Sequence, residues 1–120
     1  MRNFRNLSVR QKGHKLTLDV YKSTASFPKE ELYGLVSQIR RSALSVPSNI
    51  AEGCGRNTQS QLAHFLNISL GSASELEYQI LLAKDLDFIS EQIFKELTTQ
   101  VIEIKRMLTS LHQKVSIDLS

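Results

Sequence analysis

The stretch RRSALSVPSNIAEGCGRN, residues 40–57, decides how the chain folds. Its first half consists mainly of residues that favour helices, but Pro47 stands in the middle and lacks the N–H that a helix interior uses. Apolar side chains nevertheless recur at helical spacing from Leu32 to Ile50, and they keep their phase across the proline. The pattern therefore predicts one long helix over 28–52, kinked at the proline, rather than two separate helices.

The two ends of this helix also have sequence signals. Pro28 suits a first helical turn, where a missing N–H costs nothing. Within the helix, Pro47 cannot donate a hydrogen bond to the carbonyl of Ala43. Gly53 and Gly55 predict the C-terminal stop, because glycine readily adopts the backbone conformation that ends many helices.

Two further helices are predicted to begin at a capping box, in which a Ser or Thr hydroxyl accepts a hydrogen bond from the amide three residues later. Ser8 with Gln11 fits this pattern, and so does Thr58 with Gln61. The last helical segment carries an a/d repeat of Leu, Val and Ile. No segment has the two-residue alternation of a strand over any length. The predicted helices span residues 9–25, 28–52, 59–86 and 91–115.

Four amphipathic helices with short turns predict an all-α fold, an up-down-up-down antiparallel four-helix bundle. The chain has 120 residues, which is the size of one domain, so residues 1–120 are predicted to form a single bundle. The longest purely apolar run is about four residues, far short of the roughly 20 that cross a membrane. The polar N-terminus and the single cysteine are typical of a cytoplasmic protein that has no membrane partner.

A second set of apolar side chains lies outside the predicted core stripes. These residues also recur at helical spacing, and a helix that is apolar on two sides is usually buried on two sides. Because an isolated bundle buries only one side of each helix, we predict self-association into a symmetric homo-oligomer. The candidate oligomer face comprises Leu18, Tyr21, Tyr33, Leu44, Ile68, Tyr78, Leu82 and Leu86.

Little in the sequence supports catalysis. None of the three histidines follows a Glu at the spacing used by metal sites in helical bundles, so no metal or other cofactor is expected. Cys54 stands at a predicted helix C-terminus, which disfavours its thiolate. We therefore predict a non-enzymatic protein. Asn49, Glu52 and Glu75 are interpreted as structural polar ties that form hydrogen bonds across helices and to exposed backbone near Pro47 and Gly53.

The charges are distributed unevenly along the chain. Residues 1–56 contain ten Lys/Arg and four Asp/Glu, whereas residues 57–120 contain five and eight. A polyanion such as RNA or DNA would therefore meet the N-terminal half. Contacts with its phosphates would be independent of base sequence and sensitive to salt. The candidate nucleic-acid-binding residues are Arg2, Arg5, Lys12, Lys15, Lys22, Arg40, Arg41 and Arg56.

Two segments, FPKEELYGLVSQIRRSALSVPSNIAEGCGR and FLNISLGSASELEYQILLAKDL, resemble the S23 ribosomal protein family, whose members are encoded by intervening sequences within 23S ribosomal RNA genes. The resemblance extends over about residues 4–112 and implies a four-helix bundle that forms a ring-like homopentamer. More distantly, the chain resembles the accessory variability protein of diversity-generating retroelements, a basic pentameric barrel that binds nucleic acid and a reverse transcriptase.

Two hypotheses of function follow from the residues and the resemblance together. The first is a homo-oligomeric bundle that binds RNA or DNA weakly through its backbone, as an adaptor. The alternative is a protein-interaction scaffold that makes no contact with nucleic acid. The salt dependence of nucleic-acid binding distinguishes the two hypotheses, because only phosphate contacts release counterions.

Overall fold

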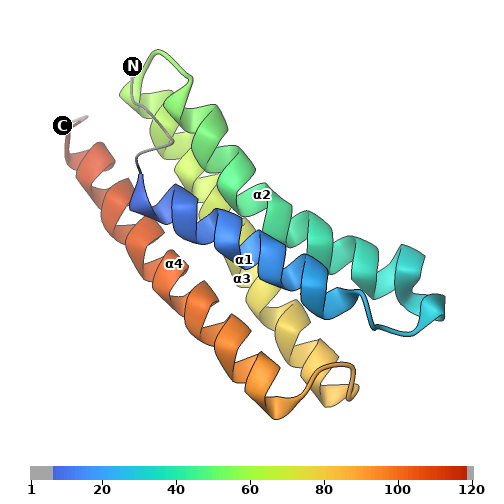
Figure 1. The fold of residues 1–120 in the computed structure, drawn as a ribbon. Helices are drawn as coiled ribbons and strands as arrows, with labels where there is room; N and C mark the ends of the chain where they lie inside the picture. The colour runs from blue at the N-terminus through green and yellow to red at the C-terminus, as the bar shows by residue number, and fades with distance from the viewer. Residues whose placement is uncertain (1–6, 119–120) are drawn as a thin grey trace.

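The computed structural model describes residues 7–118, and within them the chain forms four α-helices (Figure 1). Sequential helices pack against one another, and the last helix also contacts the first, so the predicted up-down-up-down four-helix bundle is confirmed. Between the first two helices lie a 3-10 turn, η2, and a π-helical turn, η3. The elements are α1 (Ser8–Thr24), η2 (Lys29–Glu31), η3 (Leu32–Val36), α2 (Ser37–Cys54), α3 (Gln59–Asp85) and α4 (Glu91–Asp118).

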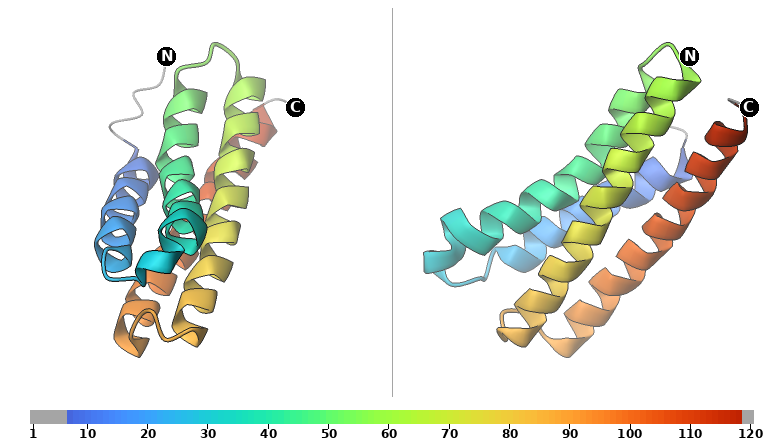
Figure 2. Two further views of the ribbon diagram at one scale, coloured as in Figure 1. Left: turned by 90° about the vertical axis from the view of Figure 1, so that its right-hand side faces the viewer. Right: turned by 180° about the vertical axis from the view of Figure 1, so that it is seen from behind.

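The four helices form two hairpins, α1 with α2 and α3 with α4, that cross at an angle (Figure 2). The hairpins lie close together near the α2–α3 connection and diverge toward their own turns. Where they diverge, the ring of Phe27 packs on the ring of Phe88 with centroids 5.3 Å apart. This pair joins the connection after α1 to the turn between α3 and α4.

The apolar stripes that were predicted for the helices form the core. On α1, the residues that recur at alternating spacings of four and three are all buried: Val9, Gly13, Leu16, Val20 and Thr24. On α3, the buried side includes Leu66, Leu76 and Ile80, all fully enclosed. The exception is Leu32, whose side chain is 49% exposed although it fits the predicted stripe of the second helix.

Leu32 is exposed because the predicted helix over 28–52 is interrupted at its start. Gly34 has φ −107° and ψ −109°, values outside the helical region, and the regular helix α2 begins only at Ser37. The Glu31 carboxylate stabilises this turn by accepting a hydrogen bond from the Leu35 amide at 3.2 Å. The helix therefore breaks at a glycine near its N-terminus, whereas α2 continues through Pro47.

The carbonyl that Pro47 leaves without a helical donor has a partner on another helix. The Thr17 hydroxyl on α1 lies 3.1 Å from the Ala43 carbonyl and 2.8 Å from the Gly13 carbonyl of its own helix. Gly13 faces the proline ring, and a Cβ added there would lie 3.5 Å from two Pro47 atoms, an ordinary contact distance. The proline is thus accommodated by close packing of α1 on α2.

The predicted start of α1 differs from the structure. The N-cap of α1 is Leu7, and no side chain caps it, so the capping box predicted at Ser8 does not form. Ser8 is already the first residue of the helix and therefore cannot act as its cap. Thr58, by contrast, accepts a hydrogen bond from the Gln61 amide at 3.1 Å, and the predicted cap of α3 is confirmed.

The C-terminal ends of α2 and α3 use different backbone geometry. Gly53 is still helical, and Gly55 caps α2 in a right-handed conformation, so the predicted glycine stop does not use the left-handed conformation. Asp87, after α3, does adopt it, with φ 62°. The Asp87 and Phe88 amides donate to the Lys84 and Ala83 carbonyls, both at 2.9 Å, which is the Schellman arrangement.

Candidate interaction surfaces

The predicted oligomer face is accessible in the single chain. All of its residues except Leu82, which is half-buried, are exposed, and Tyr33 (92%) and Tyr78 (62%) are the most exposed of its aromatic residues. They fall into three places on the fold: one group on α1 and α2, one on α3 and its C-cap residue Leu86, and Tyr33 in η3. The bundle core therefore leaves most of these apolar side chains exposed.

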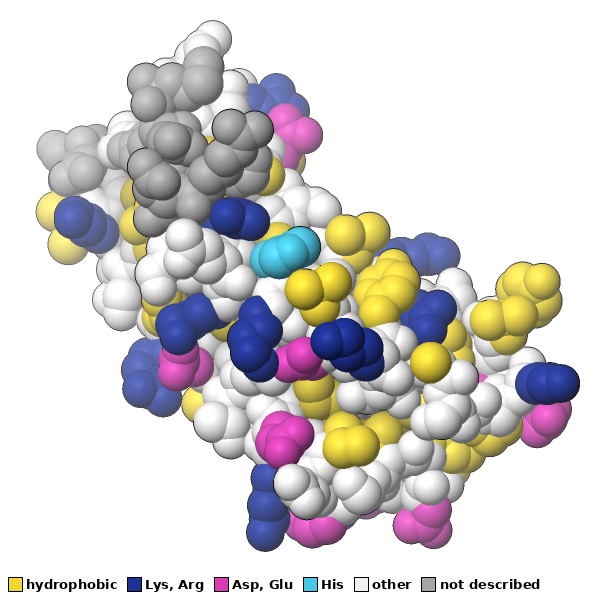
Figure 3. Space-filling view, viewed as in Figure 1, with side chains coloured by type: hydrophobic (Ala, Val, Ile, Leu, Met, Phe, Trp, Pro, Cys, Tyr) yellow, Lys and Arg dark blue, Asp and Glu magenta, His cyan; other side chains and the backbone are white. Residues whose placement is uncertain are grey.

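The first surface, which we call the α1–α2 patch, consists of Leu18, Tyr21 and Leu44. Apolar side chains gather on this side of the molecule among Lys and Arg side chains (Figure 3). The guanidinium of Arg40 lies 4.6 Å from the centre of the Tyr21 ring and donates to the Thr24 hydroxyl at 2.8 Å. Arg40 thus joins α2 to α1 beside the patch.

The second surface, the α3 stripe, runs along the side of α3 opposite the core. Its members recur at spacings of three and four residues, which places them on one helical face. Gly71 lies in this row, and no atom outside its own helix comes within 4 Å of a Cβ built there. The α3 stripe consists of Ile68, Gly71, Glu75, Tyr78, Leu82 and Leu86.

A row of hydroxyl groups joins α2 to α3 beside this stripe. The Ser42 hydroxyl donates to the Glu75 carboxylate at 2.6 Å, and the Ser45 and Ser72 hydroxyls lie 2.7 Å apart. The Ser69 hydroxyl donates to the Val46 carbonyl at 2.8 Å. The sequence interpretation treated Ser69 and Ser72 only as small residues and did not predict these hydrogen bonds, although Ser42 with Ser45 and Ser69 with Ser72 each recur at a spacing that shares one helical face.

The three predicted polar ties have different positions. Glu75 joins two helices through Ser42. Asn49 bonds within α2, because its amide donates to the Ser45 carbonyl and hydroxyl, both at 2.8 Å. Glu52 does not form the expected bond between helices; its carboxylate accepts from Arg56 at 3.1 Å, four residues later on the same surface.

Several of the predicted basic residues are engaged within the chain. Lys12 pairs with Glu103 at 2.6 Å, and Lys15 pairs with Asp19 at 2.8 Å. Arg56 pairs with Glu52 as described and also lies 5.0 Å from the centre of the Phe65 ring. These contacts within the chain reduce the positive charge that is available to a polyanion.

The other predicted basic residues are placed differently. Lys22 and Arg41 are exposed and form no ion pair with another described residue. Arg40 is half-buried in its contacts with α1. Arg2 and Arg5 lie outside the described residues. Between residues 7 and 118, Lys22 and Arg41 are therefore the exposed cations of the predicted set that form no ion pair.

Polar contacts join α1 to α4 at the seam that closes the bundle. Asp19 accepts from both Lys15 and the Gln100 amide, the latter at 2.9 Å. Burial raises the pKa of Asp19, but these two hydrogen bonds together with the positive charges of Lys15 and Lys22 hold the pKa below the usual 3.8. The bond from Lys12 likewise lowers the pKa of Glu103 below 4.5.

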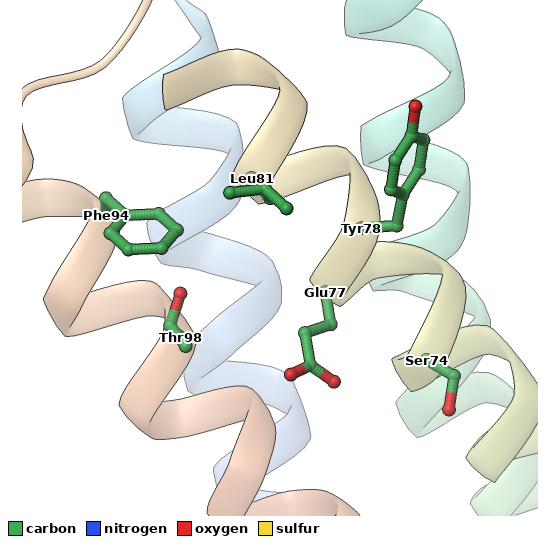
Figure 4. Close-up of a pocket in the computed structure, with 6 residues that line it drawn as sticks. All are labelled: Ser74, Glu77, Tyr78, Leu81, Phe94 and Thr98. Atoms are coloured by element: carbon green, nitrogen blue, oxygen red, sulfur yellow. The ribbon is translucent and has the colours of Figure 1, made fainter. Parts of the chain in front are cut away.

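An open pocket of about 340 Å³ lies between α3 and α4 (Figure 4). Phe94 and Leu81 lie at one end of it, and Glu77 and Thr98 point into the space between the helices. The Glu77 carboxylate accepts a hydrogen bond from Lys105 at 2.8 Å. Ser74 and Tyr78 complete the lining.

Two further negative findings concern the described residues. No group of three or more His, Cys, Asp or Glu side chains is placed to hold a metal ion in this part of the chain. No helix between residues 7 and 118 is both long and apolar enough to span a bilayer.

Comparison with known proteins adds two matches. The family described as 23S rRNA-intervening sequence protein matches residues 5–110. A crystal structure of a protein with unknown function from the S23 ribosomal protein family, from Bacteroides thetaiotaomicron, has a TM-score of 0.78 at 25% identity, covering 88% of this chain and 95% of that one. No protein in the curated set matches the chain.

Proposed function

The chain belongs to the family of 23S rRNA-intervening sequence proteins, and from its surface we propose that it is a non-enzymatic, homo-oligomeric bundle that binds RNA or DNA weakly as an adaptor. The observation that carries this proposal is the pair of exposed apolar surfaces, the α1–α2 patch and the α3 stripe, on a bundle whose core is already filled. Apolar rows of this kind are typical of surfaces that pack against another protein.

Self-association also supports the proposed nucleic-acid contact. The exposed Lys22 and Arg41 of a single chain would hold a phosphate backbone only weakly. In a symmetric oligomer each cation is repeated once per copy, so one polyanion can contact several copies at the same time. The proposed binding is therefore independent of base sequence and depends on assembly.

A salt titration tests the nucleic-acid contact. Binding of fluorescent RNA and duplex DNA of mixed sequence is followed by anisotropy between about 50 and 200 mM salt, where the logarithm of the binding constant should fall linearly with the logarithm of salt concentration. Lys22→Glu with Arg41→Glu should weaken binding at every salt concentration. The matched control is Lys95→Glu with Lys114→Glu, on α4. Absent binding at about 50 mM salt, or binding without a salt slope, contradicts the proposal.

The assembly has a separate test. Light scattering at micromolar concentration should give a mass that is a multiple of the 13.6 kDa chain. A monomer under these conditions rejects the homo-oligomer whatever the outcome of the salt titration.

The ion pairs on the surface favour a second candidate, a protein-interaction scaffold without nucleic-acid contact. Lys12, Lys15 and Arg56 each pair with an acidic side chain of the same chain, which reduces the positive charge that a phosphate backbone would meet. This candidate predicts a stoichiometric protein partner that remains bound after nuclease treatment. Loss of every partner on nuclease treatment would instead favour the nucleic-acid adaptor.

A further inference from the structure

The open pocket between α3 and α4 has no role in the proposed function. Its volume of about 340 Å³ falls within the range of small-molecule sites in proteins, roughly 300–1,000 Å³. Tyr78 and Leu81 come from α3 and Phe94 comes from α4, so both helices supply apolar or aromatic surface (Figure 4). Apart from Tyr78, the residues that line the pocket lie outside the α3 stripe.

A hydroxyl group without a partner lies in the wall of this pocket. The Thr98 oxygen is enclosed, yet it forms no hydrogen bond with any described residue. Enclosed polar groups in folded proteins nearly always have a partner, so this hydroxyl is free to donate to an acceptor. Threonine occupies two side-chain rotamers in helices, and rotation about χ1 can therefore present the hydroxyl to a molecule in the pocket without moving α4.

A carboxylate faces the same space. Glu77 points between the two helices (Figure 4), and its Oε1 atom accepts from the Lys105 amine at 2.8 Å. Its second oxygen, Oε2, forms no hydrogen bond with a described residue, so it can accept from an N–H group of a ligand. The pocket therefore offers one hydrogen-bond donor, from Thr98, and one acceptor, from Glu77.

The charged side chains around the pocket are already paired with one another. Lys105 pairs with Glu77 at 2.8 Å. Lys84 pairs with Glu91 at 3.6 Å, and its amine also lies 4.7 Å from the centre of the Phe94 ring. These four formal charges sum to zero, so a charged ligand would find no unpaired counterion among them. Because moving a charge out of water without a counterion costs free energy, the pocket favours an uncharged molecule.

We propose that this pocket binds an uncharged, planar nitrogen heterocycle. The aromatic side chains in its wall favour a flat ring, because aromatic rings pack on one another offset or edge to face. The heterocycle accepts from Thr98 through a ring nitrogen and donates to Glu77 through an N–H group, so both protein groups gain the partner that the chain does not supply. An aromatic hydrocarbon would leave both without one. This binding requires neither self-association nor nucleic acid.

Benzimidazole and indole are matched probes for this site. The two molecules share a fused-ring shape and an N–H group, but only benzimidazole has the acceptor nitrogen. Each probe is titrated into the isotope-labelled protein and followed by NMR, at a pH where both probes are uncharged. Benzimidazole should give saturable shifts at the amides of Leu81, Phe94 and Thr98, and it should bind more tightly than indole because it makes one additional hydrogen bond.

Two substitutions separate the contacts in the pocket. Thr98→Val keeps the shape of the side chain and removes the donor, so it should weaken benzimidazole binding about fivefold and leave indole binding unchanged. Leu81→Trp fills the pocket and should abolish the binding of both probes. Leu18→Trp is the matched control, because Leu18 is an exposed leucine of α1 that does not line the pocket, and it should bind like the unmodified chain. Circular dichroism of each variant verifies that its helices are intact.

Several results would overturn the proposal. If benzimidazole gives no saturable shifts at millimolar concentration, or if the shifts lie elsewhere in the bundle, the pocket is not a heterocycle site. Equal affinity for the two probes, or an equal loss of both in Thr98→Val, would show that Thr98 is not the donor and that the ligand class is wrong. Thermal unfolding is a second readout: benzimidazole should raise the Tm of the unmodified chain and of Leu18→Trp, but not of Leu81→Trp, since only a ligand bound to the folded chain stabilises it.

Discussion

At the scale of single residues, the helical glycines serve different packing needs. A Cβ at Gly53 would lie 3.0 Å from atoms of Leu62 and Phe65, so this glycine allows α2 and α3 to approach closely. A Cβ at Gly13 would meet its nearest neighbours at 3.4 to 3.5 Å, an ordinary contact distance. None of the described glycines has a positive φ, so space rather than backbone conformation distinguishes them.

Substitution by alanine should therefore have opposite effects on the free energy of unfolding at Gly13 and at Gly53. Gly13→Ala should raise the free energy of unfolding by about 0.5–1 kcal/mol, because alanine is the better helix former. Gly53→Ala should lower it by about 1 kcal/mol, since the methyl group crowds Leu62, a core residue that is 1% exposed. Urea unfolding measures both values, and a stabilised Gly53→Ala variant would contradict the close packing.

Helix caps give a second prediction at this scale. Thr58→Ala should destabilise the protein by about 1 kcal/mol, because it removes the acceptor of the Gln61 amide. Ser8→Ala is the matched control and should change stability by less than about 0.5 kcal/mol, as its hydroxyl caps nothing. Thermal unfolding of both variants tests this; equal losses would show that Ser8 caps α1 in solution.

At the scale of elements, Pro47 shows how one helix depends on another. The proline removes the donor to the Ala43 carbonyl, and the hydroxyl of Thr17 on α1 lies 3.1 Å from that oxygen, sharing its one hydrogen between it and the Gly13 carbonyl at 2.8 Å. Since Thr17 is buried, this carbonyl would otherwise be left without a donor in a region that water does not reach. The continuity of α2 is therefore linked to the packing of α1.

A double-mutant cycle follows from this link. Thr17→Val should cost about 1–3 kcal/mol of unfolding free energy. In a Pro47→Ala background the cost should fall by about 1 kcal/mol, because the restored amide can donate to Ala43. Thr24→Val is the control, at a buried threonine that bonds the Val20 carbonyl and accepts from Arg40 but bonds no carbonyl that Pro47 leaves free; it should not couple to Pro47→Ala. If the effects of Thr17→Val and Pro47→Ala on the free energy of unfolding were strictly additive, Thr17 would not be the donor that replaces the missing amide.

At the scale of the whole molecule, the seam between α1 and α4 closes the bundle. Its polar contacts include the Lys12–Glu103 pair and the bond from Gln100 to Asp19. Both carboxylates have a pKa below the ordinary value in the folded chain. Carboxylates of this kind contribute stability at pH values above their unfolded pKa, and the contribution is lost as pH falls through the folded pKa.

The seam therefore predicts how the protein responds to acid. Asp19→Asn combined with Glu103→Gln should lower stability at pH 7 and should make the loss of stability below about pH 4 shallower. Denaturant unfolding from pH 7 down to pH 2 measures the slope. Glu30→Gln, at an exposed carboxylate without an ion pair among the described residues, is the control. If the unfolding free energy of the double variant fell with pH as steeply as that of the unmodified chain, these two carboxylates would not stabilise the contact between α1 and α4.

Much of the fold could be predicted because burial follows helical periodicity. The stripes of α1 and α3 appear in the sequence at spacings of three and four, and the same residues form the core. The break at Gly34 could not be predicted in this way, because the stripe keeps its phase through it. Likewise, exposed apolar residues such as Tyr78 were identified from the pattern, whereas the intramolecular partner of Lys12 was not.

The sequence by itself determined the four helices, their core faces, the second set of apolar residues and the uneven charge, since each is a property of residue order along the chain. Only the tertiary structure decided which groups meet. It places Thr17 at the carbonyl left free by Pro47, pairs Lys12 with Glu103, and separates the basic and acidic segments into two layers. The physical reason is that periodicity fixes the face of a helix on which a side chain lies, whereas the partner across that face depends on how the hairpins pack.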